Sequence, residues 1–314
     1  MPAWGVSPRA TPERDRLLRR ASWASVSVAV GLVLAKAAAV WATQSAAVLG
    51  TLLDSAVDVM ASLVSFVAIR QSLVPPDPEH RFGHGKAEQL AALMQGVFIV
   101  GSGMFLAVQS AQRLADPHPI QAVAFGAATM VLSLVLTAAL VLYQRSVVRR
   151  TGSTAIMADS LHYTGDFALH VSVLAGLLSW WWLGWPWVDG ALGIGIAAWL
   201  VASGVRVGWI ATEALMDREL PDGERDLILA QVRTHPEVLG CHGLRTRLSG
   251  SKRIIQIHLV LDGELSLNEA HRIAVEVEHE VMRALPGSEV LIHQDPAGLD
   301  ENEHERREER RMDA

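Results

Sequence analysis

The stretch "LLDSAVDVMAS", residues 52–62, places two acids inside sequence that is otherwise apolar enough to face lipid. Its apolar flanks run back through "SAAVLG" (45–50) and forward through "LVSFVAIR" (63–70). An ionised carboxylate near the middle of a bilayer costs about 2.5 kcal/mol or more, so Asp54 and Asp58 need something that offsets this cost. Acids at such a depth are typical of ion and proton pathways.

The 314-residue chain is 50% hydrophobic and only 19% charged, and its apolar residues fall into six long blocks. Each block reaches the length of roughly 20 residues that a helix needs to cross the hydrocarbon core. The blocks cover residues 21–43, 45–69, 87–114, 120–143, 153–182 and 186–211. The first block has a polar start and no small-residue cleavage pattern after it, so we expect no cleaved signal peptide. The sequence therefore predicts a membrane protein with an all-α bundle of six transmembrane helices.

Lysine and arginine residues predict how this bundle is oriented. They gather before the first block, between the second and third, between the fourth and fifth, and at the end of the sixth, whereas the opposite loops carry none. The positive-inside rule then places both termini in the cytoplasm and the tryptophan-rich segment 180–187 at the outer surface. The formal net charge of −6 provides no basic excess for nucleic acid, which we do not expect as a partner.

The composition changes near Met216, where a second domain is predicted. Helical and strand patterns alternate there as a helix in 217–238, a hairpin of strands in 241–250 and 252–263, a helix in 266–285 and a strand in 288–296. This αββαβ order predicts a small α+β domain with helices on one face of a sheet. The expected divisions are a cytoplasmic segment 1–20, a transmembrane domain 21–212, a cytoplasmic domain 213–296 and a charged, disordered tail 297–314. The single cysteine, Cys241, excludes an internal disulfide and a cysteine-rich zinc site.

The intramembrane acids occur in a pattern that suits a metal ion. Asp54 and Asp58 are four residues apart and share one face of a helix, and His162 and Asp166 have the same spacing in "ADSLHYTGDFALH" (158–170). Three carboxylates and one imidazole can form a tetrahedral site for Zn²⁺. A ligand set without sulfur also tolerates Fe²⁺, Co²⁺ or Mn²⁺.

Two other interpretations of these acids remain open from the residues alone. They could line a polar seam paired with a buried cation, although Lys36, the only basic residue well inside the apolar blocks, cannot neutralise three acids. They could also form a proton relay that holds no metal, which is the stronger alternative.

Six motifs together resemble one known family. They are "LLDSAVDVMAS", "HRFGHGKAEQLAAL", "ADSLHYTGD", "LRTRLSG", "IQIHLVLDG" and "LIHQDP", in this order along the chain. The set is similar to the cation diffusion facilitator family, and most to its bacterial zinc/ferrous-iron proton antiporter branch. The resemblance extends from about Arg20 to Pro296. It implies a homodimer in the bacterial inner membrane, with a ferredoxin-like cytoplasmic domain on each protomer.

The resemblance also implies roles for individual residues in metal binding. The family's transport site matches Asp54, Asp58, His162 and Asp166, and His162 matches relatives that handle zinc, iron and cadmium. His170 departs from the pattern, because close relatives tend to have asparagine there. It could be a hydrogen-bond donor near the site, a step on the outer exit path or a helix-packing residue.

Two further metal sites are implied outside the membrane. The loop "VPPDPEHRFGHGKAE" (74–88) contains the family's second zinc site at Asp77, His80 and His84, and Lys86 would form a charge interlock with Asp217. In the cytoplasmic domain, the resemblance implies a two-zinc site at an interface between domains. Its residues are His242, His258, His271, His293 and Asp295, together with the backbone of Gln294. Solvated surface histidines are the alternative for both sets.

These features predict a secondary active transporter rather than an enzyme. We expect proton-coupled efflux of Zn²⁺, Fe²⁺ and Cd²⁺ by alternating access, with cytoplasmic zinc in a regulatory role. The partners are then divalent metal ions, protons, the lipid bilayer and a second copy of the chain. A membrane metallohydrolase is the first alternative, but it commonly needs the HExxH spacing, which is missing. A metal sensor that binds without transport is the second.

Overall fold

The computed structural model describes residues 11–43, 46–116, 124–185 and 187–298. The side chains of a few residues beside the gaps, including Asp54, lie outside this description. The described chain divides into two compact units. The first ends at Leu215 and the second begins at Met216.

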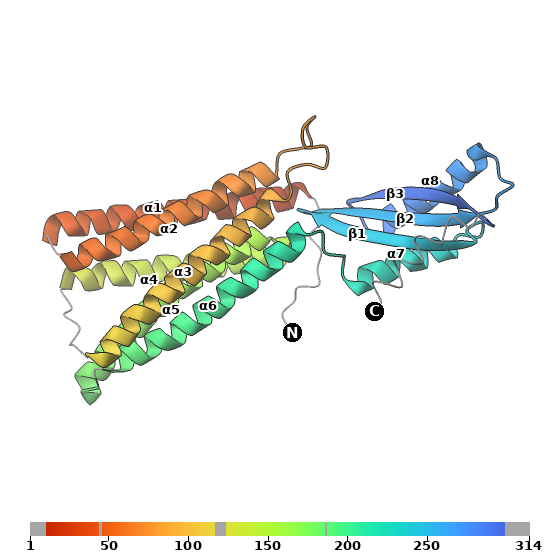
Figure 1. Ribbon diagram of the computed structural model, residues 1–314. Helices are drawn as coiled ribbons and strands as arrows, with labels where there is room; N and C mark the ends of the chain where they lie inside the picture. Colours follow the sequence, from red (N-terminus) through yellow and green to blue (C-terminus); the bar gives the residue numbers. More distant parts are fainter. Residues whose placement is uncertain (1–10, 44–45, 117–123, 186, 299–314) are drawn as a thin grey trace. The chain divides into compact units, whose positions relative to one another are not determined.

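The first unit consists of six long helices (Figure 1). They are α1 Pro12–Thr43, α2 Ala46–Ser72, α3 Ala87–Ala115, α4 Ala124–Thr151, α5 Thr154–Leu183 and α6 Val188–Leu215. Within the described residues, all of these except α2 are long and apolar enough to cross a membrane. The predicted six-helix bundle is confirmed.

α1 and α4 extend furthest beyond the apolar blocks that predicted them. α1 begins nine residues before its block, at Pro12, because its first turns are amphipathic rather than apolar. In these turns Leu18 is fully buried, and Arg14 forms a buried ion pair of 3.0 Å with Glu88 of α3. α4 likewise continues past its block to Thr151. Hydropathy detects the part of a helix that lipid surrounds, and not the turns that continue beyond it.

The bundle holds α3 and α6 in close contact, side by side along their length (Figure 1). Gly96 and Gly204 face each other there, and a Cβ added to Gly204 would lie 2.9 Å from the carbonyl oxygen of Gly96. Small residues let helix backbones approach closely in a membrane, where packing replaces the hydrophobic effect as the main attraction. A side chain at either position would force these two helices apart.

The second unit is the predicted α+β domain, and its element order confirms the sequence pattern. It contains α7 Asp222–Thr234, β1 Gly240–Ser249, β2 Lys252–Leu261, α8 Leu267–Ala284 and β3 Ser288–Pro296. The sheet order is β1-β2-β3, with β1 antiparallel and β3 parallel to the central strand. α8 opens with the expected capping box between Ser266 and Glu269.

The two faces of this sheet differ in character. Alternate residues of β2 form the core with both helices: Ile255, Ile257 and Leu259 are buried against Ile228 of α7 and Val277 of α8. Residues between them on β2 point to the opposite face, because side chains alternate along a strand. That second face is the one that carries histidine.

Candidate metal centres

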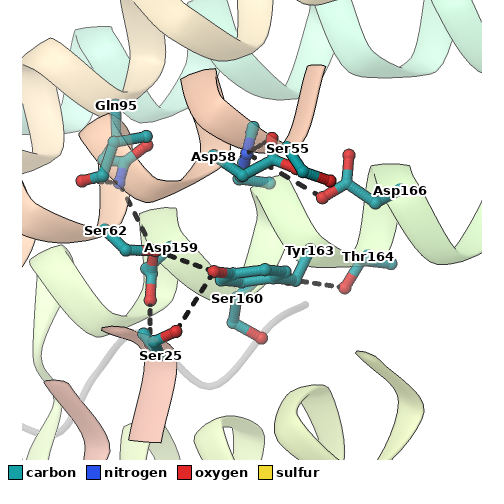
Figure 2. Close-up of polar contacts among 12 residues, drawn as sticks. Ser25, Ser55, Asp58, Ser62, Gln95, Asp159, Ser160, Tyr163, Thr164 and Asp166 are labelled. Carbon is teal, nitrogen blue, oxygen red and sulfur yellow. Dashed lines mark hydrogen bonds and ion pairs between the residues drawn. The ribbon is translucent and has the colours of Figure 1, made fainter. Parts of the chain in front are cut away.

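The first centre lies inside the helical bundle and joins α2 to α5 (Figure 2). His162 Nε2 lies 3.1 Å from Asp58 Oδ1 and 3.8 Å from Asp166 Oδ2. One ligand atom from each of the three residues falls within 4.8 Å of the others. His162 and Asp166 share a face of α5 because they are four residues apart, and α2 presents Asp58 to them.

The burial of this cluster suits an ion that enters from water. The His162 side chain is 5% exposed, whereas those of Asp58 and Asp166 are 22% and 29% exposed. His162 is eight residues into α5, so it lies about 12 Å along the helix from its start. Asp54 belongs to the same helix as Asp58, but its side chain lies outside the described part, so its role as fourth ligand stays a prediction.

Two neighbouring polar side chains have partners of their own. Lys36 Nζ of α1 donates to Ser55 Oγ of α2 at 2.6 Å, close to Asp58 in the chain. His170 Nδ1 donates to the backbone carbonyl of Asp166 at 2.6 Å, within its own helix. His170 is thus tied to a ligand-bearing turn through the backbone.

The sequence analysis missed a second buried acid beside this cluster. Asp159 is only 1% exposed and accepts hydrogen bonds from Ser25 of α1, Gln95 of α3 and Gln144 of α4. It stands three residues before His162, a spacing that places both near one side of α5. That spacing was the available signal, but the partners lie on three other helices and no local pattern reveals them.

The second centre lies in the loop between α2 and α3 and brings together Asp77, His80 and His84. Asp77 Oδ1 lies 3.3 Å from His80 Nδ1, and Asp77 Oδ2 lies 3.3 Å from His84 Nε2. The backbone N–H groups of His80 and Glu79 also donate to Asp77 Oδ1, at 2.6 and 3.0 Å. These bonds, and that from His80 above all, lower the pKa of Asp77 below its usual value. Among the described residues, the buried Nδ1 of His84 has no hydrogen-bond partner.

The third centre lies on the sheet face that the helices leave uncovered. In the strand register, His242 of β1 is paired with His258 of β2, which is paired with His293 of β3. Asp295 lies close to all three imidazoles, at 3.1 Å from His242 Nε2, 2.9 Å from His258 Nδ1 and 3.1 Å from His293 Nε2. A bulge after His242 shifts the register, with Gly243 in the left-handed region at φ 61°.

The remaining predicted residues are not gathered into these groups in the described structure. His271 is exposed on α8, which packs on the opposite face of the sheet, so it lies away from His242. Gln294 lies on β3 and is paired in register with Leu259. Lys86 Nζ donates to the carbonyl of Leu215 at 3.1 Å, and Asp217 accepts from Arg247 at 3.3 Å. The Lys86–Asp217 interlock stays a prediction.

The bundle, its buried histidine–aspartate cluster and the appended α+β domain have the organisation of a membrane transporter of cations. Family models agree with this class along nearly the whole chain. The cation efflux transmembrane domain matches residues 22–216, and the cytoplasmic domain of cation efflux proteins matches residues 220–297. The chain belongs to the cation efflux family, also known as the cation diffusion facilitator family, in the branch of the FieF pumps.

Two FieF pumps support the same assignment, and one solved structure is similar in sequence to part of the chain. The cation-efflux pump FieF of Klebsiella pneumoniae is 46% identical over 285 residues, which cover 90% of this chain and 94% of that protein. The FieF pump of Salmonella arizonae is 45% identical with the same coverage. The metal-bound C-terminal domain of the CzcD transporter from Thermotoga maritima is 31% identical over 25% of this chain and 93% of its own, with a TM-score of 0.25.

Proposed function

We propose that the protein exports Zn²⁺, Fe²⁺ and Cd²⁺ from the cytoplasm in exchange for protons. The observation that carries this proposal is the cluster of Asp58, His162 and Asp166 inside a bundle of predominantly apolar helices. Such a nitrogen and oxygen set suits Zn²⁺ and Fe²⁺. We include Asp54 as the fourth ligand, since it lies one turn from Asp58 on α2.

The exchange of metal for protons follows from the chemistry of these atoms. Metal ligands must be deprotonated, so a bound metal releases protons and an arriving proton releases metal. His162 Nε2 and Asp58 Oδ1 are 3.1 Å apart, a distance that a shared proton can bridge. The same two atoms would hold either a proton or a metal, and this exclusion couples the two flows. Helix packing that opens first to one side and then to the other would complete the cycle.

The proposed orientation places both termini in the cytoplasm of a bacterial inner-membrane protein. α2 and α4 end with Arg70, Arg149 and Arg150 at the side we assign to the cytoplasm. At the opposite ends, Trp181 and Trp182 of α5 are about 80% exposed, as expected for side chains at a membrane surface.

Competition between metals in sealed proteoliposomes tests this function. Uptake of Zn²⁺, Fe²⁺ and Cd²⁺ should exceed that of Mn²⁺, because imidazole favours the softer ions. Binding without flux would instead identify a metal sensor.

The cytoplasmic domain is proposed to bind regulatory zinc and to hold two copies of the chain together. His242, His258, His293 and Asp295 would hold the metal, and the exposed His271 is available to a second copy. His242 and His258 converge on Oδ2 of Asp295, an arrangement that fits Zn²⁺, whereas His293 contacts Oδ1 of the same carboxylate. The bound ion would link strands of the sheet. Cytoplasmic zinc would then favour one state of the transporter by binding it more tightly.

Changing His242 and His258 together to alanine should weaken metal-dependent dimerisation and reduce Zn²⁺ flux without abolishing it, because the ion path does not include this domain. Light scattering with and without Zn²⁺, followed by flux in proteoliposomes, measures both effects. The matched control is His279→Ala, an exposed histidine of α8 outside the three centres. A complete loss of flux in a folded double variant would contradict the separation of roles.

The loop centre is proposed to hold one metal ion, for which the unpartnered His84 Nδ1 and the converging side chains provide a fit. Folding lowers the pKa of Asp77, so its ionised carboxylate stabilises the folded loop fully at any pH above its ordinary pKa. This stabilisation is lost as the pH falls through the lowered pKa. Asp77 therefore remains a charged ligand throughout the neutral range.

Asp77→Asn should reduce the number of tightly bound Zn²⁺ ions per protomer by one at pH 7.5. Asparagine keeps the shape of the side chain but removes the charge that holds both histidines. Equilibrium dialysis counts the ions, with Glu79→Gln as the control because Glu79 contributes only its backbone N–H. An unchanged count would show that this loop does not bind metal.

A further inference from the structure

Asp159 joins α5 to three other helices close to the group of Asp58, His162 and Asp166, which we call the transport cluster (Figure 2). Its Oδ2 accepts from Ser25 Oγ of α1 and from Gln144 Nε2 of α4, the latter at 2.6 Å, and its Oδ1 accepts from Gln95 Nε2 of α3 at 3.3 Å. All four side chains are buried. The single carboxylate of Asp159 on α5 thus contacts α1, α3 and α4.

The same network extends to α2, the helix that carries Asp58. Gln95 Nε2 also lies 3.0 Å from the carbonyl oxygen of Ala61 and 2.9 Å from Ser65 Oγ. Tyr163, the residue after His162, shares a hydrogen bond of 2.7 Å with Ser62 Oγ. Asp159 reaches α2 through Gln95, and Tyr163 reaches it directly.

These links lie within one turn of the metal ligands on both helices. Ser62 follows Asp58 by four residues on α2, and Tyr163 is adjacent to His162 on α5. All described ligands of the transport cluster come from these two helices, so the distance from Asp58 to His162 depends on the spacing of α2 and α5. In Figure 2 Ser25 and Asp159 lie apart from Asp58 and Asp166. The Tyr163 ring in addition packs edge to face against the His162 ring, with the two ring centroids 5.6 Å apart.

The polar atoms of this network fix how the helices are placed and do not merely fill space between them. Both glutamines direct their NH₂ groups to Asp159, while their buried Oε1 atoms have no hydrogen-bond partner among the described residues. Leaving polar atoms unpaired inside a bundle is unfavourable, and apolar side chains of similar size would avoid it. The polar atoms supply directional bonds between helices, which apolar packing does not.

We propose that Asp159 and Tyr163 are positioning residues of the transport site and contribute to its choice of metal. They hold α5 against α2 at the spacing that lets Asp58 and the His162–Asp166 pair close around a small cation. The inference rests on the proposed function of that cluster. When these hydrogen bonds are removed, the two helices separate slightly and the site fits larger ions better. Transport of Cd²⁺ should then increase relative to transport of Zn²⁺.

A matched pair of serine variants tests the direct link between the two helices. Ser62→Ala removes the bond to Tyr163, whereas Ser172→Ala removes a bond from a buried serine to its own helix α5. In proteoliposome flux, Ser62→Ala should raise the KM for Zn²⁺ about tenfold, change kcat little and shift the Zn²⁺/Cd²⁺ preference toward Cd²⁺. Ser172→Ala should leave KM and preference unchanged.

Two more variants complete the test. Tyr163→Phe removes the bond to Ser62 and also the 3.4 Å bond that Tyr163 Oη donates to the carbonyl oxygen of Ser25, so it should shift KM and preference at least as far as Ser62→Ala. The double variant should add little to Tyr163→Phe, because the bond between Ser62 and Tyr163 is already lost there. Asp159→Asn should shift the Zn²⁺/Cd²⁺ preference further toward Cd²⁺. Folded variants whose KM and metal preference equal those of the wild type would overturn the proposal. Asp58→Ala, measured alongside, separates this outcome from failure of the proposed function, since full flux in that variant would reject the transport site itself.

Discussion

Replacing Asp58 with alanine is expected to reduce Zn²⁺ flux by at least about a hundredfold. The change removes the only described ligand that α2 contributes and leaves His162 Nε2 without its partner at 3.1 Å. Loss of a residue that merely orients a ligand costs roughly ten- to a hundredfold in metal affinity, so loss of a ligand should cost more. The fold should survive, because Asp58 is partly exposed and does not belong to the buried core.

Radiolabelled Zn²⁺ uptake into proteoliposomes, normalised to folded protein, measures this effect. The matched control is Asp226→Ala, which removes an exposed acid from α7 in the other unit and should keep wild-type flux. Wild-type flux in Asp58→Ala would mean that the transported ion does not bind at this cluster.

Changing His162 to aspartate should alter metal choice and pH dependence together. The cluster would then be made only of carboxylates, which suit Mn²⁺ better than an imidazole does, so discrimination against Mn²⁺ should relax. A free imidazole titrates at about pH 6.5 and a free carboxyl at about 3.9. Protons would therefore displace the metal only at lower pH, and the flux profile should move toward acid.

Competitive uptake of Zn²⁺, Cd²⁺ and Mn²⁺ at several pH values tests both consequences. His170→Asn is the control, because His170 is an imidazole of the same helix that donates to a backbone carbonyl. That variant should keep the wild-type profile. If His162→Asp also keeps the metal preference and the pH profile, His162 is not a ligand and proton coupling must reside in the carboxylates.

Local spacing explains why so much of the transport cluster could be predicted. An i,i+4 pair lies on one helix face whatever the rest of the fold does, so His162 and Asp166 had to be neighbours. Strand alternation similarly put His258 on one face of β2, and the register of the sheet brought His242 and His293 beside it.

Contacts between distant helices could not be predicted in this way. The partners of Asp159 lie 15, 64 and 134 residues away in the chain, and only the packing of the bundle brings them together. Arg14 and Glu88 are separated by 74 residues and form a buried pair for the same reason. A single sequence shows which face of a helix is polar, but it does not show which helix that face meets.

Metal and proton movement measured in the same proteoliposomes tests the central claim most directly. A pH-sensitive dye is enclosed in the lumen, and the membrane potential is clamped with potassium and valinomycin so that protons do not move merely to balance charge. If Asp58, His162 and Asp166 exchange metal for protons, Zn²⁺ added outside should enter and the lumen should become more alkaline, and Asp58→Ala should lose both signals. Zn²⁺ entry without any change in the lumenal pH would contradict the account.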